Sequence, residues 1–371
     1  MTVPNLMNQT ELLICNQALQ DHFDAIHCPS ERHASQGKKY AAIFSRIEQF
    51  VDAAVDGQVL PIPPITDDSA RRMFRVSGPA ESHFGWFQEY LKIIEMLFND
   101  FRYAESVELF KAVKSEISRL PSAPSFETDV GLQAKHETPL ANINYFNIFV
   151  EHLRIVGRNE RYCERKRNRQ RECDERYREY RQYVLDLFSQ WARLIVLRLD
   201  FHYEKHGRGI VDLSTVSKDL DHLLANRRNN RLFRGMRGYI AKIEYGVGRQ
   251  AHIHTLWFFD GSIRDGESHG YLAKSIGEYW KTQITNNFGT YWNSNADIQF
   301  FRKRNTCGIG DINYSDSLAI HNLNEYVVKY LCKKEQFVRP ANQTLIKLYR
   351  RGLLPRPKNM KRGRPRILSS A

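Results

Sequence analysis

The sequence predicts an α+β fold, in which a central antiparallel sheet with flanking helices follows a mostly α-helical N-terminal domain. Three observations predict it. The first 120 residues repeat apolar side chains at the spacing of three to four that helices require. Residues 194–203 alternate with the period of two that is typical of a strand. Two further strand-like segments, 238–246 and 252–261, are separated by a short glycine-containing loop, which predicts an antiparallel hairpin.

The composition excludes several classes of protein. The chain has 371 residues, of which 42% are hydrophobic and 12% aromatic, so it carries enough apolar surface for packed cores. Its apolar runs, such as residues 194–197, fall far short of the roughly 20 residues that a membrane span needs. The N-terminus lacks a basic start followed by an apolar run, so we expect no signal peptide. The six cysteines lack metal-like spacing and indicate reduced thiols in a cytoplasmic protein.

The net charge of +13 is distributed unevenly along the chain. Residues 1–150 contain 13 Lys+Arg and 19 Asp+Glu, a net charge of −6. Residues 151–371 contain 42 Lys+Arg and 23 Asp+Glu, a net charge of +19. This asymmetry favours a nucleic-acid-binding part joined to an acidic part, and a merely soluble basic surface is the alternative.

The chain divides into four predicted segments. Residues 1–155 form the helical N-terminal domain, whose role the sequence does not indicate. Residues 156–191 are dominated by Arg, Glu and Tyr and predict one long charged helix, either solvated and supported by pairs such as Glu172–Arg176 or contacting phosphates. Residues 192–345 contain the predicted sheet, and residues 346–371 form a basic tail that we expect to be extended or disordered.

Within the sheet domain, the first strand places Arg198, Asp200 and His202 on one face. Asp200 and His202 either lie near a functional site or form a polar outer face. Helices are predicted at about 212–225, 271–288 and 320–337. A basic stretch ends the first of these helices, and its Arg227 and Arg228 are candidate DNA contacts. Several aromatic residues fit either a core or a surface that stacks on bases: Trp257, Phe258, Phe259, Trp280, Tyr279, Tyr291 and Trp292.

The strongest chemical pattern is His252-Ile253-His254 with Glu244 on the preceding strand. Residues two apart on a strand point to the same face, so both imidazoles meet on one side of the hairpin. Two imidazoles and a carboxylate can hold a divalent metal, Mg²⁺ or Mn²⁺, and leave positions open for a phosphate oxygen and water. A surface strand that happens to carry two histidines is the alternative for this pair alone.

A second pattern is a tandem YxxK motif, formed by Tyr326 with Lys329 and by Tyr330 with Lys333. On an α-helix the two tyrosines lie four residues apart on one face, with the lysines in a stripe beside them. A tyrosine is a weak nucleophile unless a metal-polarised electrophile or a nearby cation assists it. The alternative is an amphipathic core helix with exposed lysine ends.

Taken together, HIH followed by YxxK resembles the HUH endonuclease superfamily of replication initiators and relaxases. More narrowly, residues of about 190–370 resemble the inovirus gene-II-like replication proteins and the related YagK/YfjJ-type prophage proteins. The segments that carry this likeness are LRLDFHY, GYIAKIEYGVGRQAHIHTLWFFDG, IGEYWK, YWN, EYVVKYLCKKEQ and the terminal RGRPR. The likeness covers about half of the chain, and the N-terminal 150 residues lie outside it.

The resemblance implies an HUH/RRM-like sheet with the histidine pair on a middle strand and a nucleophile helix facing it. His252 and His254 then take the metal-ligand roles, with Glu244 as the third ligand. Tyr330 with Lys333 matches the family's YLxK form, and Tyr326 with Lys329 is a departure that resembles two-tyrosine initiators, so the number of active tyrosines stays open.

The same resemblance implies a function in the cytoplasm of a bacterial host. The protein would nick single-stranded origin DNA in rolling-circle replication, leave a 5′-phosphotyrosine and a 3′-OH, and work with a host helicase or polymerase, without a small-molecule cofactor. A plasmid-type relaxase and a phage-derived DNA-binding regulator with an inactive site are the alternatives. In the tail, Arg362, Arg364 and Arg366 resemble an AT-hook core, and the alternative for them is nonspecific phosphate binding.

Overall fold

The computed structural model describes residues 37–62, 79–95, 97, 101–120, 140–204, 211–246, 250–332, 338–340 and 346–354. The N-terminal part is helical, as predicted, with one short strand. Its elements are α2 (Gly37–Val55), α3 (Pro79–Glu95), β1 (Phe101–Tyr103), α4 (Glu105–Ile117) and α5 (Leu140–Gly157).

Aromatic side chains form the core of this N-terminal bundle. Phe50, Phe87, Phe110, Phe146 and Phe149 are all fully buried. Most of their rings meet edge-on or tilted, Phe50 stacks on Phe146, and the centroids of Phe110 and Phe149 are only 4.5 Å apart. Offset and edge-to-face contacts of this kind stabilise a core beyond the area that they bury. The bundle therefore has an apolar core of its own, separate from that of the sheet.

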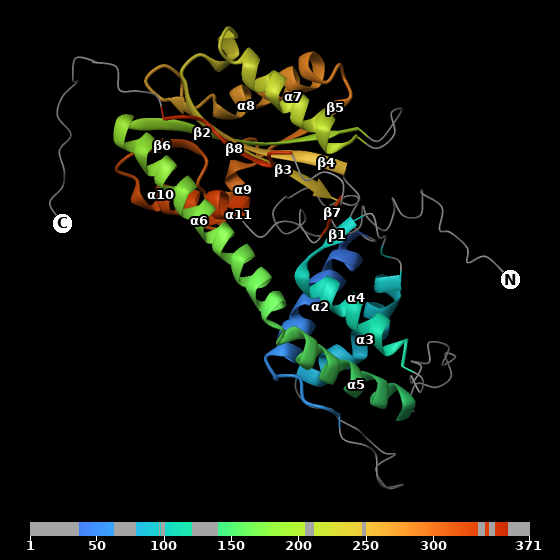
Figure 1. The fold of residues 1–371 in the computed structure, drawn as a ribbon. Coiled ribbons are helices and arrows are strands. Elements are labelled where there is room, and N and C mark those ends of the chain that lie inside the picture. The colour runs from blue at the N-terminus through green and yellow to red at the C-terminus, as the bar shows by residue number, and fades with distance from the viewer. Residues whose placement is uncertain are drawn as a thin grey trace.

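The predicted long charged helix is α6 (Glu160–Gln190), which runs from the bundle to the sheet (Figure 1). Asn159 caps its start, since its side chain accepts a hydrogen bond from the backbone N–H of Arg161. Lys166 and Arg169 form ion pairs of 2.5 Å each with Asp52 and Glu105 of the bundle. Two of the helix's basic side chains are thus engaged with the N-terminal part of the chain.

The second half of the chain contains an antiparallel sheet. Its strands are β2 (Arg193–Tyr203), β3 (Met236–Gly246), β4 (Gln250–Asp260), β5 (Gly289–Asn293), β6 (Gly310–Asn313) and β8 (Tyr349–Arg351). The order is β5-β2-β4-β3-β8, and β6 pairs with the start of β2. The predicted hairpin is β3–β4, and β4, the strand with both histidines, lies in the middle.

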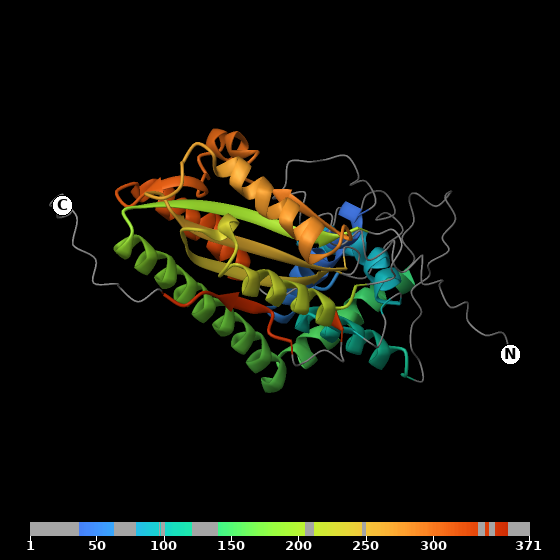
Figure 2. The same cartoon turned by 90° about the horizontal axis from the view of Figure 1, so that it is seen from above.

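Helices cover both faces of this sheet (Figures 1 and 2). On one face, α7 (Leu213–Asn226) and α8 (His269–Tyr279) pack over a core that includes Phe201 and Trp257. On the other, α6 packs together with α10 (Ser317–Asn322) and α11 (Lys329–Cys332) over Leu256 and Phe258. The helix α9 (Ile298–Lys303) adds Ile298 to this second core.

Two predicted helices differ from the observed elements. The helix expected at 271–288 ends in a π-helical turn, Trp280–Ile284, because Asn286 and Asn287 adopt left-handed backbone angles with φ of 50° and 65°. The helix expected at 320–337 is divided by a π-helical segment, Leu323–Val328, and α11 ends at Cys332. Residues 333–337 lie outside the described part.

The sheet also extends beyond the boundary expected at residue 345. Strand β8 pairs Tyr349, Arg350 and Arg351 with the outer edge of β3. The first part of the basic tail is therefore ordered as an edge strand, while residues 355–371 lie outside the described residues. The β8 segment lacks the alternation of apolar and polar residues that is typical of a strand, so its sequence pattern did not predict one.

A second, two-stranded sheet joins distant parts of the chain. Strand β1 pairs antiparallel with β7 (Val338–Pro340), so that Phe101 lies opposite Pro340. This pairing connects the N-terminal bundle to the segment that follows α11.

Two expectations about the whole chain can be checked on the described residues. Cys163, Cys173, Cys307 and Cys332 are all thiols, as predicted, and the other two cysteines lie outside the described ranges. Nowhere in the described ranges is a helix both long enough and apolar enough to cross a lipid bilayer.

Candidate metal centre and nucleophile

Strand register brings the predicted metal ligands together. Glu244 on β3 lies directly opposite His252 on β4. His254 lies between Lys242 of β3 on one side and Asp200 of β2 on the other. Because side chains alternate along a strand, all five point to the sheet face that α6 and α11 cover.

The three ligand atoms converge within a few ångströms. The Nε2 atoms of His252 and His254 are 3.2 Å apart, and Glu244 Oε2 lies 3.2 Å from His254 Nε2 and 3.6 Å from His252 Nε2. Ligands about 2.1 Å from a six-coordinate ion at right angles are separated by about 3.0 Å, and tetrahedral ligands by about 3.4 Å. The spacing of these side chains therefore suits a divalent metal, with one carboxylate and two imidazoles as donors.

Asp200 orients one of these imidazoles. Its Oδ1 atom lies 2.8 Å from Nδ1 of His254, and both side chains are buried. Metal-ligating histidines commonly direct their second ring nitrogen to a carboxylate, which fixes the ring and its tautomer. Burial by itself lowers the pKa of His254, but the carboxylates of Asp200 and Glu244 outweigh it and raise the pKa to about 10. The two carboxylates thus favour a positive charge on His254.

Two buried cations balance the two carboxylates. Lys242 forms an ion pair with Glu244 although only 3% of its surface is exposed. Arg198 Nη2 lies 3.9 Å from Asp200 Oδ2. Burial opposes ionisation of Glu244, yet Lys242 and His254 hold its pKa well below the ordinary value. With both carboxylates ionised and both cations present, a divalent ion would leave the site with a net positive charge.

Tyr330 packs directly against this cluster from α11. Its ring meets that of His254 edge-on, with a centroid distance of 5.6 Å. The guanidinium of Arg198 lies 5.1 Å from the centre of the Tyr330 ring, so a cation adjoins the phenol. Tyr330 is 6% exposed. Of the two candidate nucleophiles, Tyr330 is the one that contacts a metal-ligand side chain among the described contacts.

Tyr326 and the two lysines occupy different positions. Tyr326 lies in the π-helical segment and is 49% exposed, whereas Tyr330 is buried. Lys329 Nζ lies 2.7 Å from Glu325 Oε2, and Glu325 also accepts a hydrogen bond from Tyr177 of α6. Lys333 lies outside the described residues.

The remaining candidates separate into core, pocket and undescribed positions. Trp257, Phe258, Phe259 and Trp280 are fully buried, so these four are core residues and cannot stack on bases. Tyr279, Tyr291 and Trp292 are partly exposed. Arg227 and Arg228 lie where α7 ends, on the sheet face opposite the metal ligands. Arg362, Arg364 and Arg366 lie in the undescribed tail.

Lys242 is the site residue that sequence reasoning missed. It is two residues before Glu244, so strand alternation places both on one face, and that parity is the signal that could have found it. His202, an open candidate, stacks on His252 with a centroid distance of 5.3 Å.

Comparison with known proteins gives no match. No protein-family model matches the chain, and searches of curated proteins and of solved structures find no similar protein.

Proposed function

We propose that this protein is a metal-dependent DNA endonuclease of the HUH type that nicks single-stranded origin DNA with Tyr330 to initiate rolling-circle replication. The observation that carries the proposal is the convergence of His252, His254 and Glu244 on one face of the middle strands, with Tyr330 packed against His254. A mid-sheet histidine pair that faces a tyrosine helix agrees with an HUH/RRM-like arrangement.

The transesterification exchanges one phosphodiester for another. The phenolic oxygen of Tyr330 forms a bond to the scissile phosphorus, the bond from phosphorus to the 3′-oxygen breaks, and the proton lost by the phenol is balanced by one gained by the 3′-oxygen. A divalent ion held by Glu244, His252 and His254 supplies electrostatic stabilisation of the charge that develops on the phosphate. The products are a 5′-phosphotyrosine on the protein and a 3′-OH that a host polymerase can extend.

The neighbouring side chains fit this chemistry. Arg198 lies beside the Tyr330 ring, so a cation adjoins the proposed nucleophile. Asp200 holds His254 so that its Nε2 atom faces the other two ligands. The reaction conserves the energy of the phosphodiester bond in the protein–DNA link, so the same site can later rejoin a strand.

A labelling experiment tests the proposal. The purified chain is incubated with single-stranded oligonucleotides that tile the DNA element encoding it, in Mn²⁺ or in EDTA. With a 3′-end label we expect a denaturation-resistant protein–DNA band in Mn²⁺ only, since the protein keeps the 5′-phosphate of the downstream fragment. With a 5′-end label we expect a shorter free fragment that a DNA polymerase extends.

Variants of the two tyrosines and two histidines test which side chains take part in the reaction. Tyr330→Phe is expected to abolish the band, and Tyr326→Phe to retain the first round of cleavage, because Tyr330 packs on His254 whereas Tyr326 is 49% exposed. His252→Ala/His254→Ala should remove the band while leaving DNA binding. An adduct that persists in the Tyr326→Phe/Tyr330→Phe double variant excludes tyrosine as the nucleophile. Tight binding that is equal in Mn²⁺ and EDTA, with no adduct on any oligonucleotide, supports a regulator instead.

A further inference from the structure

A basic pocket lies on the opposite face of the sheet from the metal ligands. It has a volume of about 560 Å³ and is lined by the end of α7, by Tyr239 of β3 and by residues of and before β8. Tyr239 belongs to the core that α7 covers, whereas Glu244 and the histidines face α6 and α11. The pocket is therefore separated from the candidate nuclease site by the sheet, at the edge that β8 forms.

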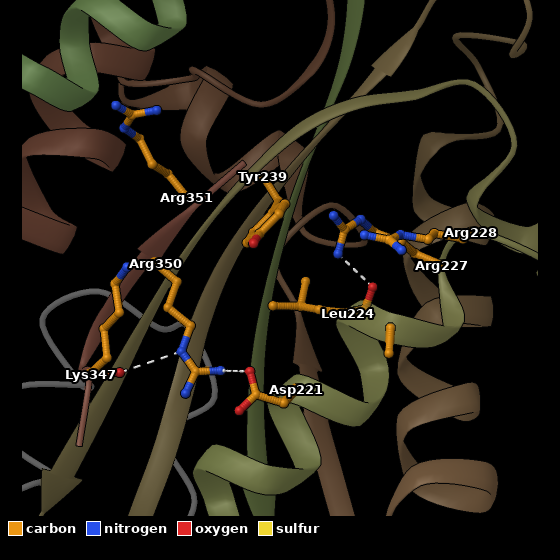
Figure 3. A pocket seen from close by; sticks show the side chains of 9 residues that line it. Asp221, Leu224, Arg227, Arg228, Tyr239, Lys347, Arg350 and Arg351 are labelled. Carbon is orange, nitrogen blue, oxygen red and sulfur yellow. Dashed lines mark hydrogen bonds and ion pairs between the residues drawn. The ribbon is translucent and has the colours of Figure 1, made fainter. Parts of the chain in front are cut away.

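The lining is strongly cationic. Figure 3 shows how the side chains lie: Arg350 reaches across to Asp221, and the guanidinium of Arg227 turns toward the carbonyl of Leu224. The cations are Arg227, Arg228, Lys347, Arg350 and Arg351, against a single carboxylate, Asp221.

Three of these cations form contacts within the protein. Arg350 bridges β8 to α7 through Asp221 and through Ser217 Oγ at 2.5 Å, and Arg351 pairs with Glu179 of α6 at 2.6 Å. Arg227 donates to the Leu224 carbonyl at 2.5 Å and lies 5.2 Å from the centre of the Tyr239 ring.

The other two cations, Arg228 and Lys347, have no described partner for their side-chain charges, and both are exposed. Placing two such cations at the rim of an already positive pocket costs electrostatic energy, which an anionic ligand would offset. The pocket also adjoins the start of the basic tail. The described chain ends at Leu354, three residues after β8, and residues 355–371 contain six Lys or Arg and no Asp or Glu.

We infer that this pocket is a second DNA-binding site, which holds the phosphodiester backbone of DNA outside the catalytic face. The inference rests on the proposed function, since it extends how that enzyme would hold its DNA. Arg228 and Lys347 contact phosphate oxygens, and Arg227 and Tyr239 line the pocket beside them. One face of the sheet would thus anchor the DNA while the other cuts it.

The salt dependence of DNA binding tests this inference, and its size distinguishes duplex from single-stranded DNA in the pocket. The variant Arg228→Gln/Lys347→Gln removes the two unpartnered charges and spares the cations that bridge elements. Each phosphate contact contributes about −0.9 to the slope of log K against log salt for a duplex and about −0.7 for a single strand. We expect the slope of the full-length protein to flatten by about 1.8 if the pocket holds duplex and by about 1.4 if it holds single-stranded DNA.

A matched control carries the same loss of charge elsewhere. Lys218 of α7 and Lys274 of α8 are exposed on the same side of the sheet and outside the pocket. Lys218→Gln/Lys274→Gln is expected to keep the wild-type slope. An unchanged slope in Arg228→Gln/Lys347→Gln, or an equal flattening in both double variants, overturns the inference.

The outcome is independent of whether the protein cuts DNA. The His252→Ala/His254→Ala variant should bind with the wild-type salt slope, because its substitutions lie on the other face. If wild-type protein forms no covalent adduct but the pocket variant still flattens the slope, the nuclease proposal fails and the DNA-binding pocket stands.

Discussion

Two of the three ligands at the candidate metal centre have a second partner in the sheet. His254 is held between Asp200 and Glu244, and Glu244 is shared between the imidazoles and Lys242. Lys242 pairs with Oε1 of Glu244 whereas the imidazoles face Oε2, so the carboxylate can bind a metal and keep its buried partner. Neighbours of this kind set metal affinity together with the ligands themselves.

Asp200→Asn is expected to weaken Mn²⁺ binding by about 10- to 100-fold at pH 7. The substitution also lowers the pKa of His254, so a proton on this imidazole competes less with the metal. Asp200, however, also fixes the ring so that Nε2 faces the other two ligands, and this orientation is lost in the variant. Isothermal titration calorimetry with Mn²⁺ measures it. Asp311→Asn, which removes a carboxylate paired with Arg193 at the other end of β2, is the control, and an equal effect of both would contradict the role of Asp200.

At the scale of elements, local pairing explains what the sequence could predict. Glu244 and His252 are eight residues apart across one hairpin, so strand alternation was enough to place them on the same face with His254. The approach of Asp200 and Tyr330 depends on strand order and on helix packing over long separations, which periodicity does not encode. The division of the predicted 320–337 helix by a π-helical segment, and the pairing of β8, likewise depend on tertiary contacts.

The cap of α7 gives a prediction about stability. The Asp212 carboxylate accepts a hydrogen bond of 2.7 Å from the backbone N–H of Thr215 at the start of the helix. We expect Asp212→Ala to lower the free energy of unfolding by about 1 kcal/mol at pH 7, and Asp212→Asn to cost much less because asparagine also caps helices well. Urea denaturation monitored by circular dichroism measures both variants.

The same cap predicts a pH dependence. The hydrogen bonds from Thr215 lower the pKa of Asp212 below its ordinary value. The stabilisation by the ionised carboxylate is therefore complete above the unfolded-state pKa of about 3.9 and is lost as the pH falls through the lower folded-state pKa. The difference between wild type and Asp212→Ala should accordingly shrink at acidic pH. A difference that stays constant down to pH 3 would show that the cap acts without its charge.

The whole molecule contains separate cores joined by α6. The aromatic core of the bundle ends at Tyr162, while the cores on the two faces of the sheet begin at Tyr180. The net charge changes sign between the corresponding parts of the chain. Packing of this kind favours two units that unfold in separate cooperative steps.

Calorimetry should therefore resolve two transitions, of which Mn²⁺ shifts one. A ligand at about 100 times its Kd stabilises the folded state by about 2.7 kcal/mol, which corresponds to a rise on the order of 5–10 °C for a domain of this size. We expect the rise in the transition of the sheet unit and none in that of the bundle. The His252→Ala/His254→Ala variant should show no shift. A single transition that moves as a whole would contradict two separate units.

The β1–β7 pair has a consequence for how the chain is made. Phe101 leaves the ribosome long before its partner Pro340, with 239 residues separating them. At about 5–20 residues per second, the edge of β1 waits roughly 12–48 s for β7 to be synthesised. An unpaired strand edge invites association with other chains, and a short edge limits that risk. Because β1 has only three residues, the nascent bundle exposes little template for aggregation while translation of the rest of the chain is completed.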